Sequence, residues 1–126
     1  MDWSRWPNFK ESEFRCKHTG KCHMDSTFMD RLQRLRTAFG RPMVVTSGYR
    51  DASHPAEAAK TTTGSHQLGR AVDIRVTGPD AFRLVTMAPE FGFTGIGVQQ
   101  KGNVRFIHLD DLPPGVGFVR PTIWSY

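Results

Sequence analysis

Two short stretches of the sequence, AVDIRV at residues 71–76 and FIHLD at residues 106–110, decide the fold. In both, aliphatic residues alternate with other residue types, and this period of two is typical of a β-strand with one buried face. Asp73 and His108 stand between the aliphatic residues, so both should lie on the face turned away from the core. The residues predicted to face the core are Val72, Ile74, Ile107 and Leu109.

The clearest predicted helix covers residues 24–39, where apolar residues recur at helical spacing. Asp25 or Ser26 can cap its first turn. Gly40 ends it, because glycine readily adopts the left-handed conformation that closes a helix. The apolar stripe, which we expect to pack in the core, consists of Phe28, Leu32, Leu35 and Phe39.

Shorter signals place the remaining elements. Strands are predicted at residues 43–46, 95–99 and 104–109, and short helices or turns at 8–14, 55–60 and 78–88. The last two strands should form a hairpin, and the aromatic end of the tail should pack back on the domain. Helices and strands do not alternate as in βαβ proteins. We therefore predict an α+β fold with a mainly antiparallel sheet and flanking helices, as a single domain over residues 1–126.

Composition narrows the classes of partner. The formal net charge is +5, which either serves solubility or favours a polyanion such as nucleic acid, an anionic membrane or a bacterial wall polymer. The sequence has no Lys/Arg run with interleaved aromatic residues, so it does not point to a nucleic-acid partner. It also has no apolar run as long as the roughly 18 residues of a transmembrane helix. The N-terminus lacks the apolar stretch of a signal peptide. We expect a monomer made in the cytoplasm and not exported by that route.

Three residues form a candidate metal site. His66 precedes the strand at 71–76, and small residues between them would let its loop fold close to Asp73. His108 projects from the second strand. Two histidines and one carboxylate with an open fourth position are what a catalytic zinc requires, since water must occupy that position. The alternative is that these are ordinary core or surface residues, because a histidine on a strand is more often one of these than a metal ligand.

The motifs SGYR at 47–50, HQLGRAVDI at 66–74 and FIHLD at 106–110 together resemble one family. It comprises the zinc D-alanyl-D-alanine carboxypeptidases and related L-alanyl-D-glutamate endopeptidases, includes phage endolysins, and shares its metal-site fold with the hedgehog signalling domain. The likeness extends from about residue 9 to residue 110. It implies a hedgehog/DD-peptidase-like fold. It also implies Zn²⁺ ligands at His66, Asp73 and His108.

The resemblance further implies that Arg50 binds substrate or stabilises the oxyanion; a guanidinium suits either role because it keeps its charge and offers several donors. Many relatives carry an acidic general base three residues before the last zinc histidine, where this chain has Arg105. Asp110 is then the nearest candidate for the base. The alternative role for Asp110 is a carboxylate that orients a metal ligand.

Two further residues are predicted to contact substrate. Relatives often have Ser or Thr two places before the first zinc histidine, where this chain has Gly64, and Ser65 is the nearest hydroxyl beside that histidine. His54 stands where relatives often have a histidine, so we expect it to border the cleft. A solvent-exposed loop residue is the alternative for His54.

The segment CKHTGKCH at residues 16–23 holds four side chains that could bind a soft metal. The spacing is tighter than is usual for a four-ligand zinc site. A disulfide between Cys16 and Cys22, or two free thiols, is the favoured interpretation over a second metal.

The sequence thus predicts a zinc peptidase that cuts stem peptides of bacterial peptidoglycan, in the manner of a phage endolysin that reaches the wall after release. Position 105 holds Arg105 in place of the acidic residue of many relatives, and this difference favours one alternative. In that alternative the chain is a non-catalytic, zinc-containing module that binds the wall or serves as a virion structural protein.

Overall fold

The computed structural model describes residues 1–60, 63–115 and 117–126. Within these residues a five-stranded sheet has the strand order β1-β2-β4-β3-β5. The strands are β1 (Val44–Ser47), β2 (Ala71–Arg75), β3 (Gly95–Gln99), β4 (Phe106–Asp110) and β5 (Thr122–Ser125). All neighbours are antiparallel except β3 and β5, which are parallel. The predicted α+β fold with a mainly antiparallel sheet is confirmed.

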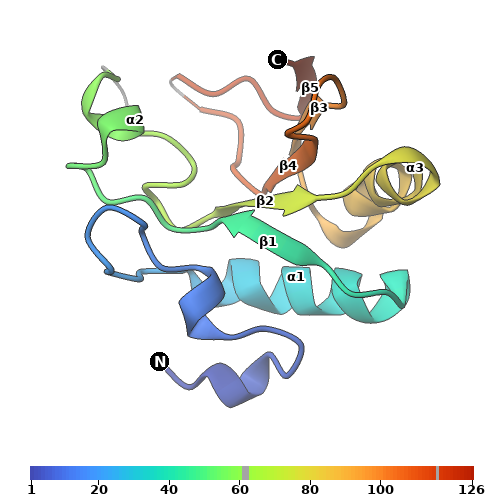
Figure 1. The fold of residues 1–126 in the computed structure, drawn as a ribbon, viewed down its shortest axis with the longest axis horizontal. Helices are drawn as coiled ribbons and strands as arrows, with labels where there is room; N and C mark the ends of the chain where they lie inside the picture. Colours follow the sequence, from blue (N-terminus) through green and yellow to red (C-terminus); the bar gives the residue numbers. More distant parts are fainter. Residues whose placement is uncertain (61–62, 116) are drawn as a thin grey trace.

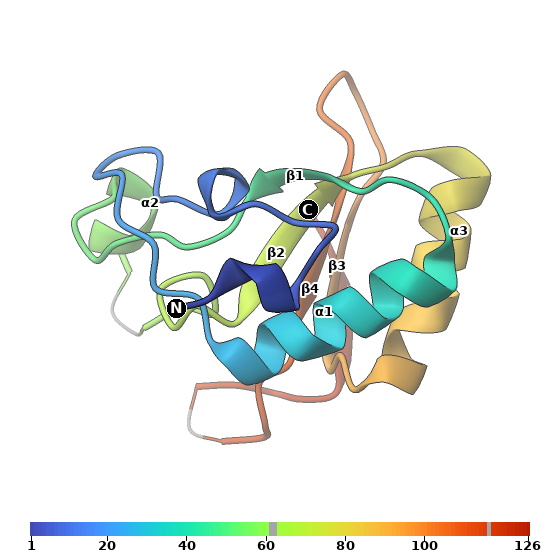
Figure 2. The ribbon, with the colours of Figure 1, turned by 90° about the horizontal axis from the view of Figure 1, so that it is seen from below.

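Three α-helices accompany the sheet: α1 (Ser26–Phe39), α2 (Pro55–Ala58) and α3 (Gly78–Met87). Short 3₁₀ turns lie at Trp3–Arg5, Glu11–Glu13 and Ala88–Phe91. Helix α1 and the N-terminal segment lie on one side of the sheet, whereas α2 and the segment leading to β5 lie on the other (Figure 1). Figure 2 shows the same arrangement from the side of α1, which crosses in front of the strands.

The start and the end of α1 follow the predicted signals. Asp25 caps the helix, since its Oδ2 accepts a hydrogen bond from the Phe28 backbone N–H at 2.8 Å. Gly40 closes it at φ 74°, in the left-handed region where glycine has no steric penalty. All four residues of the predicted apolar stripe are buried. The prediction for this helix is confirmed.

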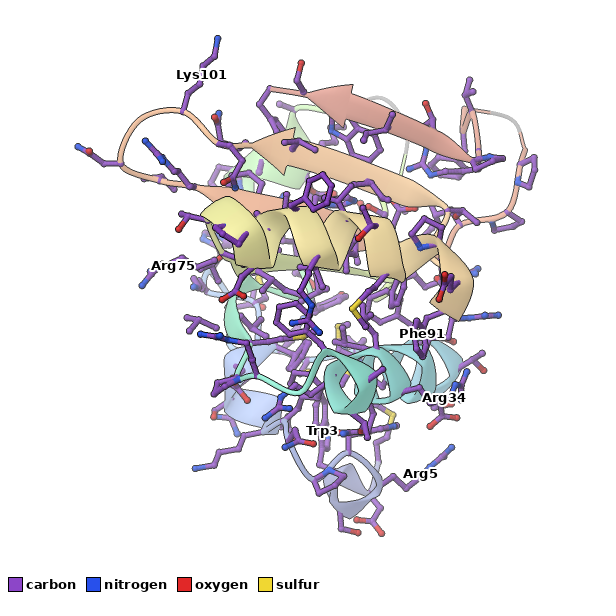
Figure 3. The ribbon with its side chains drawn as sticks, turned by 90° about the vertical axis from the view of Figure 1, so that its right-hand side faces the viewer. Trp3, Arg5, Arg34, Arg75, Phe91 and Lys101 are labelled. Atoms are coloured by element: carbon purple, nitrogen blue, oxygen red, sulfur yellow. The ribbon has the colours of Figure 1, made fainter. Side chains whose placement is uncertain are left out.

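The core fills the space between the sheet and α1. The four aliphatic residues predicted to face it, Val72, Ile74, Ile107 and Leu109, are no more than 1% exposed. Side chains of α3 and of the N-terminal segment complete this layer, with Trp3 near α1 and Phe91 at the end of the α3 layer (Figure 3). Burial on this face leaves the opposite face of β2 and β4 free to carry polar groups.

Two elements differ from the prediction. Strand β4 begins at Phe106, because residues 101–105 form an exposed turn in which Val104 is 74% exposed; Lys101 projects outward from this turn (Figure 3). The tail forms a strand, β5, that its Pro/Gly-rich sequence did not predict. Among the described residues, no helix is long and apolar enough to cross a membrane.

Candidate metal centre

Asp73 and His108 come together through the pairing of β2 with β4. The two residues are directly opposite each other in this antiparallel ladder, and opposed residues on one face have neighbouring side chains. His108 Nδ1 lies 3.0 Å from Asp73 Oδ1. The alternation of each strand, together with this register, therefore places two of the three predicted ligands in contact.

His66 reaches the same point from the loop before β2. The loop packs closely on the segment before α1: the Gly69 carbonyl accepts from Asp25 N at 2.9 Å. A Cβ at Gly69 would collide with the His23 carbonyl oxygen, and Gly69 also has φ 70°, so this tight approach requires glycine. The His66 Nε2 atom then lies 3.3 Å from Asp73 Oδ1.

The three side chains fit a zinc ion. One ligand atom from each lies within 4.8 Å of the others, and all three residues are buried. Zinc bonds of about 2.0–2.1 Å in a tetrahedral site separate ligand atoms by roughly 3.4 Å, close to the His–Asp separations observed here. Two imidazoles and one carboxylate are also a donor set that zinc accepts. Among the described residues this is the only cluster of His, Cys, Asp or Glu close enough to hold a metal.

Each histidine is oriented by a partner on its far nitrogen. His66 Nδ1 lies 2.7 Å from the Gly48 carbonyl oxygen, which requires a proton on Nδ1 and leaves the Nε2 lone pair facing the site. His108 Nε2 lies 2.8 Å from Asp110 Oδ2, so its Nδ1 can be the metal-binding atom. Such outer partners fix the tautomer and orientation of metal-binding histidines.

The electrostatics suit a cation. Burial lowers the pKa of His66 despite the nearby Asp73, so this imidazole is neutral and can donate a lone pair. Burial opposes ionisation of Asp73, but hydrogen bonds to His108 and His66 outweigh it and hold its pKa well below the usual range. Burial works to lower the pKa of His108, but the hydrogen bonds to Asp110 and Asp73 outweigh it and raise the pKa. A metal entering the site would displace a proton from His108.

Asp110 lies behind His108, away from open solvent. It is 0% exposed. Besides His108, it binds Arg120, whose Nε and Nη2 lie 2.9 Å and 2.8 Å from its two oxygens. Burial works against its charge, yet these contacts lower its pKa to about 2. Of the two roles predicted for Asp110, this geometry suits the orienting carboxylate better than the general base, because both oxygens already have partners.

We therefore expect Asp110→Asn to weaken the site moderately. The amide can replace only part of the hydrogen bonding to His108 and Arg120, so zinc affinity and turnover should each fall about 10- to 100-fold, as for other outer partners of metal ligands. Zinc titration with a competing chelator, and turnover at saturating zinc, measure the two effects separately. Unchanged zinc affinity with a loss of turnover beyond about a hundredfold would instead identify Asp110 as the base.

Arg50 follows β1 and points at the metal site. Its Nη2 lies 3.6 Å from Asp73 Oδ2 and its Nη1 lies 3.6 Å from Glu57 Oε2. Its side chain keeps 23% exposure, so it is held by two carboxylates and still reaches the cleft. Glu57 also contacts Lys60 at 3.0 Å. Neither Glu57 nor Lys60 was predicted to lie at the site; their i, i+3 spacing in a predicted helical turn is the signal that could have indicated them.

A cleft of about 390 Å³ opens above the three ligands. Its described lining includes Ser65, whose contact with substrate stays a prediction. It also includes four tail residues that were not predicted to lie there: Phe118, Arg120, Trp124 and Tyr126. His54 does not line it: His54 caps α2 through Nδ1, which accepts from Ala56 N at 3.0 Å, and borders a separate hollow beside Arg50. The substrate role of His54 stays a prediction.

The cysteine-rich segment does not gather into a second cluster of metal ligands among the described residues. Both cysteines are free, with Cys16 buried and Cys22 half-buried. Cys16 Sγ accepts a hydrogen bond from Asp51 N at 3.3 Å. This agrees with the free-thiol interpretation and ties the segment to the loop after Arg50.

A buried two-histidine, one-carboxylate site under an open cleft has the donor set and the access that a catalytic zinc site requires. The chain belongs to the family described as Peptidase M15, whose profile matches residues 7–110. Members of this family are zinc peptidases, and the predicted family resemblance is confirmed. A comparison with curated proteins finds no match.

Proposed function

We propose that this chain is a zinc peptidase that hydrolyses stem peptides of bacterial peptidoglycan, used as an endolysin-like enzyme on the wall. The observation that carries the proposal is the site itself: His66, Asp73 and His108 converge beneath a cleft that also contains Arg50. When bound there, zinc would polarise a scissile carbonyl and generate a nucleophile from water near neutral pH.

Residues of the chain itself would orient the metal site and bind the substrate. Asp110 holds the His108 ring, so that its Nδ1 faces the metal position. Arg50 supplies a permanent positive charge beside Asp73, suited to a substrate carboxylate or to a carbonyl oxygen that gains charge in the transition state. Burial of the ligands excludes water from beneath the site and strengthens these interactions.

The charge of the cleft supports a peptidoglycan substrate. Arg50 and Lys60 both line it, whereas Asp73 is its one side-chain carboxylate among the described lining residues. Stem peptides carry free carboxylates, at D-glutamate and at the terminal D-alanine, that such a cationic side can bind. The net charge of +5 would in addition favour approach to an anionic wall.

One feature of the cleft supports the non-catalytic alternative. Arg105, at the position of the usual acid, lies in the exposed turn before β4 and donates from Nε to the Gly102 carbonyl at 2.9 Å. No side-chain carboxylate other than that of Asp73 lines the described part of the cleft. A wall-binding module that keeps zinc without hydrolysis would share this geometry, so retention on the wall must be measured alongside cleavage.

The deciding experiment follows hydrolysis of purified peptidoglycan by the release of free amino groups. Chelation should abolish the release and added zinc should restore it, because the three ligands are the only described metal cluster. Mass spectrometry of the released fragments then identifies the bond. Full activity after thorough metal removal would contradict a zinc peptidase, and retention on the wall without any release would support the binding module.

A further inference from the structure

The segment after β4 forms one wall of the cleft, although it lies beyond residues 7–110 that match the family. It returns across the site face and ends in β5, which pairs in parallel with β3 at the edge of the sheet. Figure 1 shows this segment and α2 on the same side of the sheet. The cleft is thus cationic near Arg50 and aromatic along the tail.

Two glycines on β3 make room for Trp124 of the tail and for the Asp110 carboxylate. Gly97 pairs with His108 on one side and with Trp124 on the other. A Cβ at Gly97 would lie 2.7 Å from Trp124 Nε1, so the indole lies over the bare backbone and its ring centroid comes within 5.1 Å of that of His108. At Gly95 a Cβ would collide with the Asp110 carboxylate.

A buried ion pair fastens the tail in this place. Arg120 binds both oxygens of Asp110, the same carboxylate that orients His108. Only 11% of the Arg120 side chain is exposed, and a bidentate pair of this kind fixes geometry as well as charge. The position of the tail is therefore coupled to the orientation of a metal ligand.

Tyr126 follows β5 and belongs to the lining of the cleft. Its backbone N–H donates to the Val98 carbonyl, and its ring lies 5.1 Å from that of Phe106. It lines the cleft together with Arg50 and the three metal ligands. The side chain is 60% exposed, so a substrate can reach it.

The hydroxyl is a donor at neutral pH. Partial burial raises the pKa of Tyr126, and the charge of Asp73 acts in the same direction. A neutral phenol can donate a hydrogen bond, so the Tyr126 hydroxyl can act as a donor to a ligand in the cleft.

We propose that Tyr126 is a further catalytic residue, which donates a hydrogen bond from its hydroxyl to the scissile carbonyl oxygen as negative charge develops there. The tail would then provide a donor in the same cleft that Arg50 lines. This inference rests on the proposed peptidase function. It adds a substrate contact outside the part of the chain that matches the family.

The test compares Tyr126→Phe with the wild type on purified peptidoglycan. The substitution removes the hydroxyl and keeps the ring, so turnover should fall about 10- to 100-fold, the range for a hydrogen bond to a charged group. Zinc content should not change. Ile123→Ala is the matched control in the adjoining strand β5, since Ile123 is 60% exposed and is not among the described residues that line the cleft; it should keep wild-type turnover.

A second measurement separates transition-state binding from general packing. A phosphinate isostere of the cleaved bond carries a tetrahedral, anionic centre, so Tyr126→Phe should weaken its binding about as much as it lowers turnover, while affinity for the product peptide stays unchanged. Wild-type turnover and phosphinate affinity in Tyr126→Phe would overturn this inference and leave the peptidase intact. A wild-type protein that hydrolyses no wall would overturn the peptidase function, and this inference with it.

Discussion

Asp73→Asn should lose bound zinc and lower peptidoglycan hydrolysis by about 10⁴-fold, since the Lewis-acid role of a catalytic metal contributes several kcal/mol to the barrier. Asp73 lies at the centre of the proposed zinc site: its Oδ1 lies within 3.3 Å of His66 Nε2 and within 3.0 Å of His108 Nδ1. The amide keeps the shape of the side chain but removes the negative charge that would offset the positive charge of zinc. Elemental analysis of the purified protein and a rate measurement check both parts.

The matched control is Asp80→Asn, the same chemical change in α3, where Asp80 pairs with Arg41 far from the ligands. It should keep zinc and activity. Circular dichroism must show that Asp73→Asn is folded, because Asp73 also pairs with Arg50. A folded Asp73→Asn protein with undiminished zinc would show that Asp73 is not a ligand.

The site could be predicted from the sequence as far as local periodicity extends. The alternation in β2 and β4 determines that Asp73 and His108 leave the core face, and both strands are rich enough in aliphatic residues for the pattern to be unambiguous. The placement of His66 needed a loop that folds back, which the nearby glycine at position 69 indicated. Those predictions required only the properties of single strands and one turn.

The tail could not be predicted in the same way. Strand β5 is a parallel edge strand of four residues after a Pro/Gly-rich segment, so its pairing with β3 depends on contacts between distant parts of the chain. The ion pair of Arg120 with Asp110 has the same origin. A sequence pattern shows on which face of a strand a side chain lies. It does not show which distant residue neutralises the charge of that side chain. This is why the sequence led to the base role for Asp110 and left its orienting role as the alternative.

Arg50→Ala should keep zinc and lower turnover by about 10²- to 10³-fold, the loss seen when one donor to a developing oxyanion is removed. Arg50 does not belong to the three-ligand cluster, so metal content should be nearly unchanged. Zinc analysis together with kcat and KM on stem-peptide fragments measures the effect. Arg75→Ala is the matched control, because Arg75 is the exposed last residue of β2 (Figure 3) and should leave all three values unchanged.

Arg50→Lys tests what the guanidinium contributes beyond its charge. Arg50 contacts Asp73 through Nη2 and Glu57 through Nη1, and a single ammonium cannot reproduce this two-sided contact. We therefore expect Lys to recover only part of the lost turnover, with the larger deficit in kcat if the guanidinium acts in the transition state and in KM if it binds a substrate carboxylate. Wild-type rates in folded Arg50→Ala would mean that the two carboxylates, and not the substrate, are its only partners. Arg50 would then stabilise the wall of the cleft without taking part in the reaction.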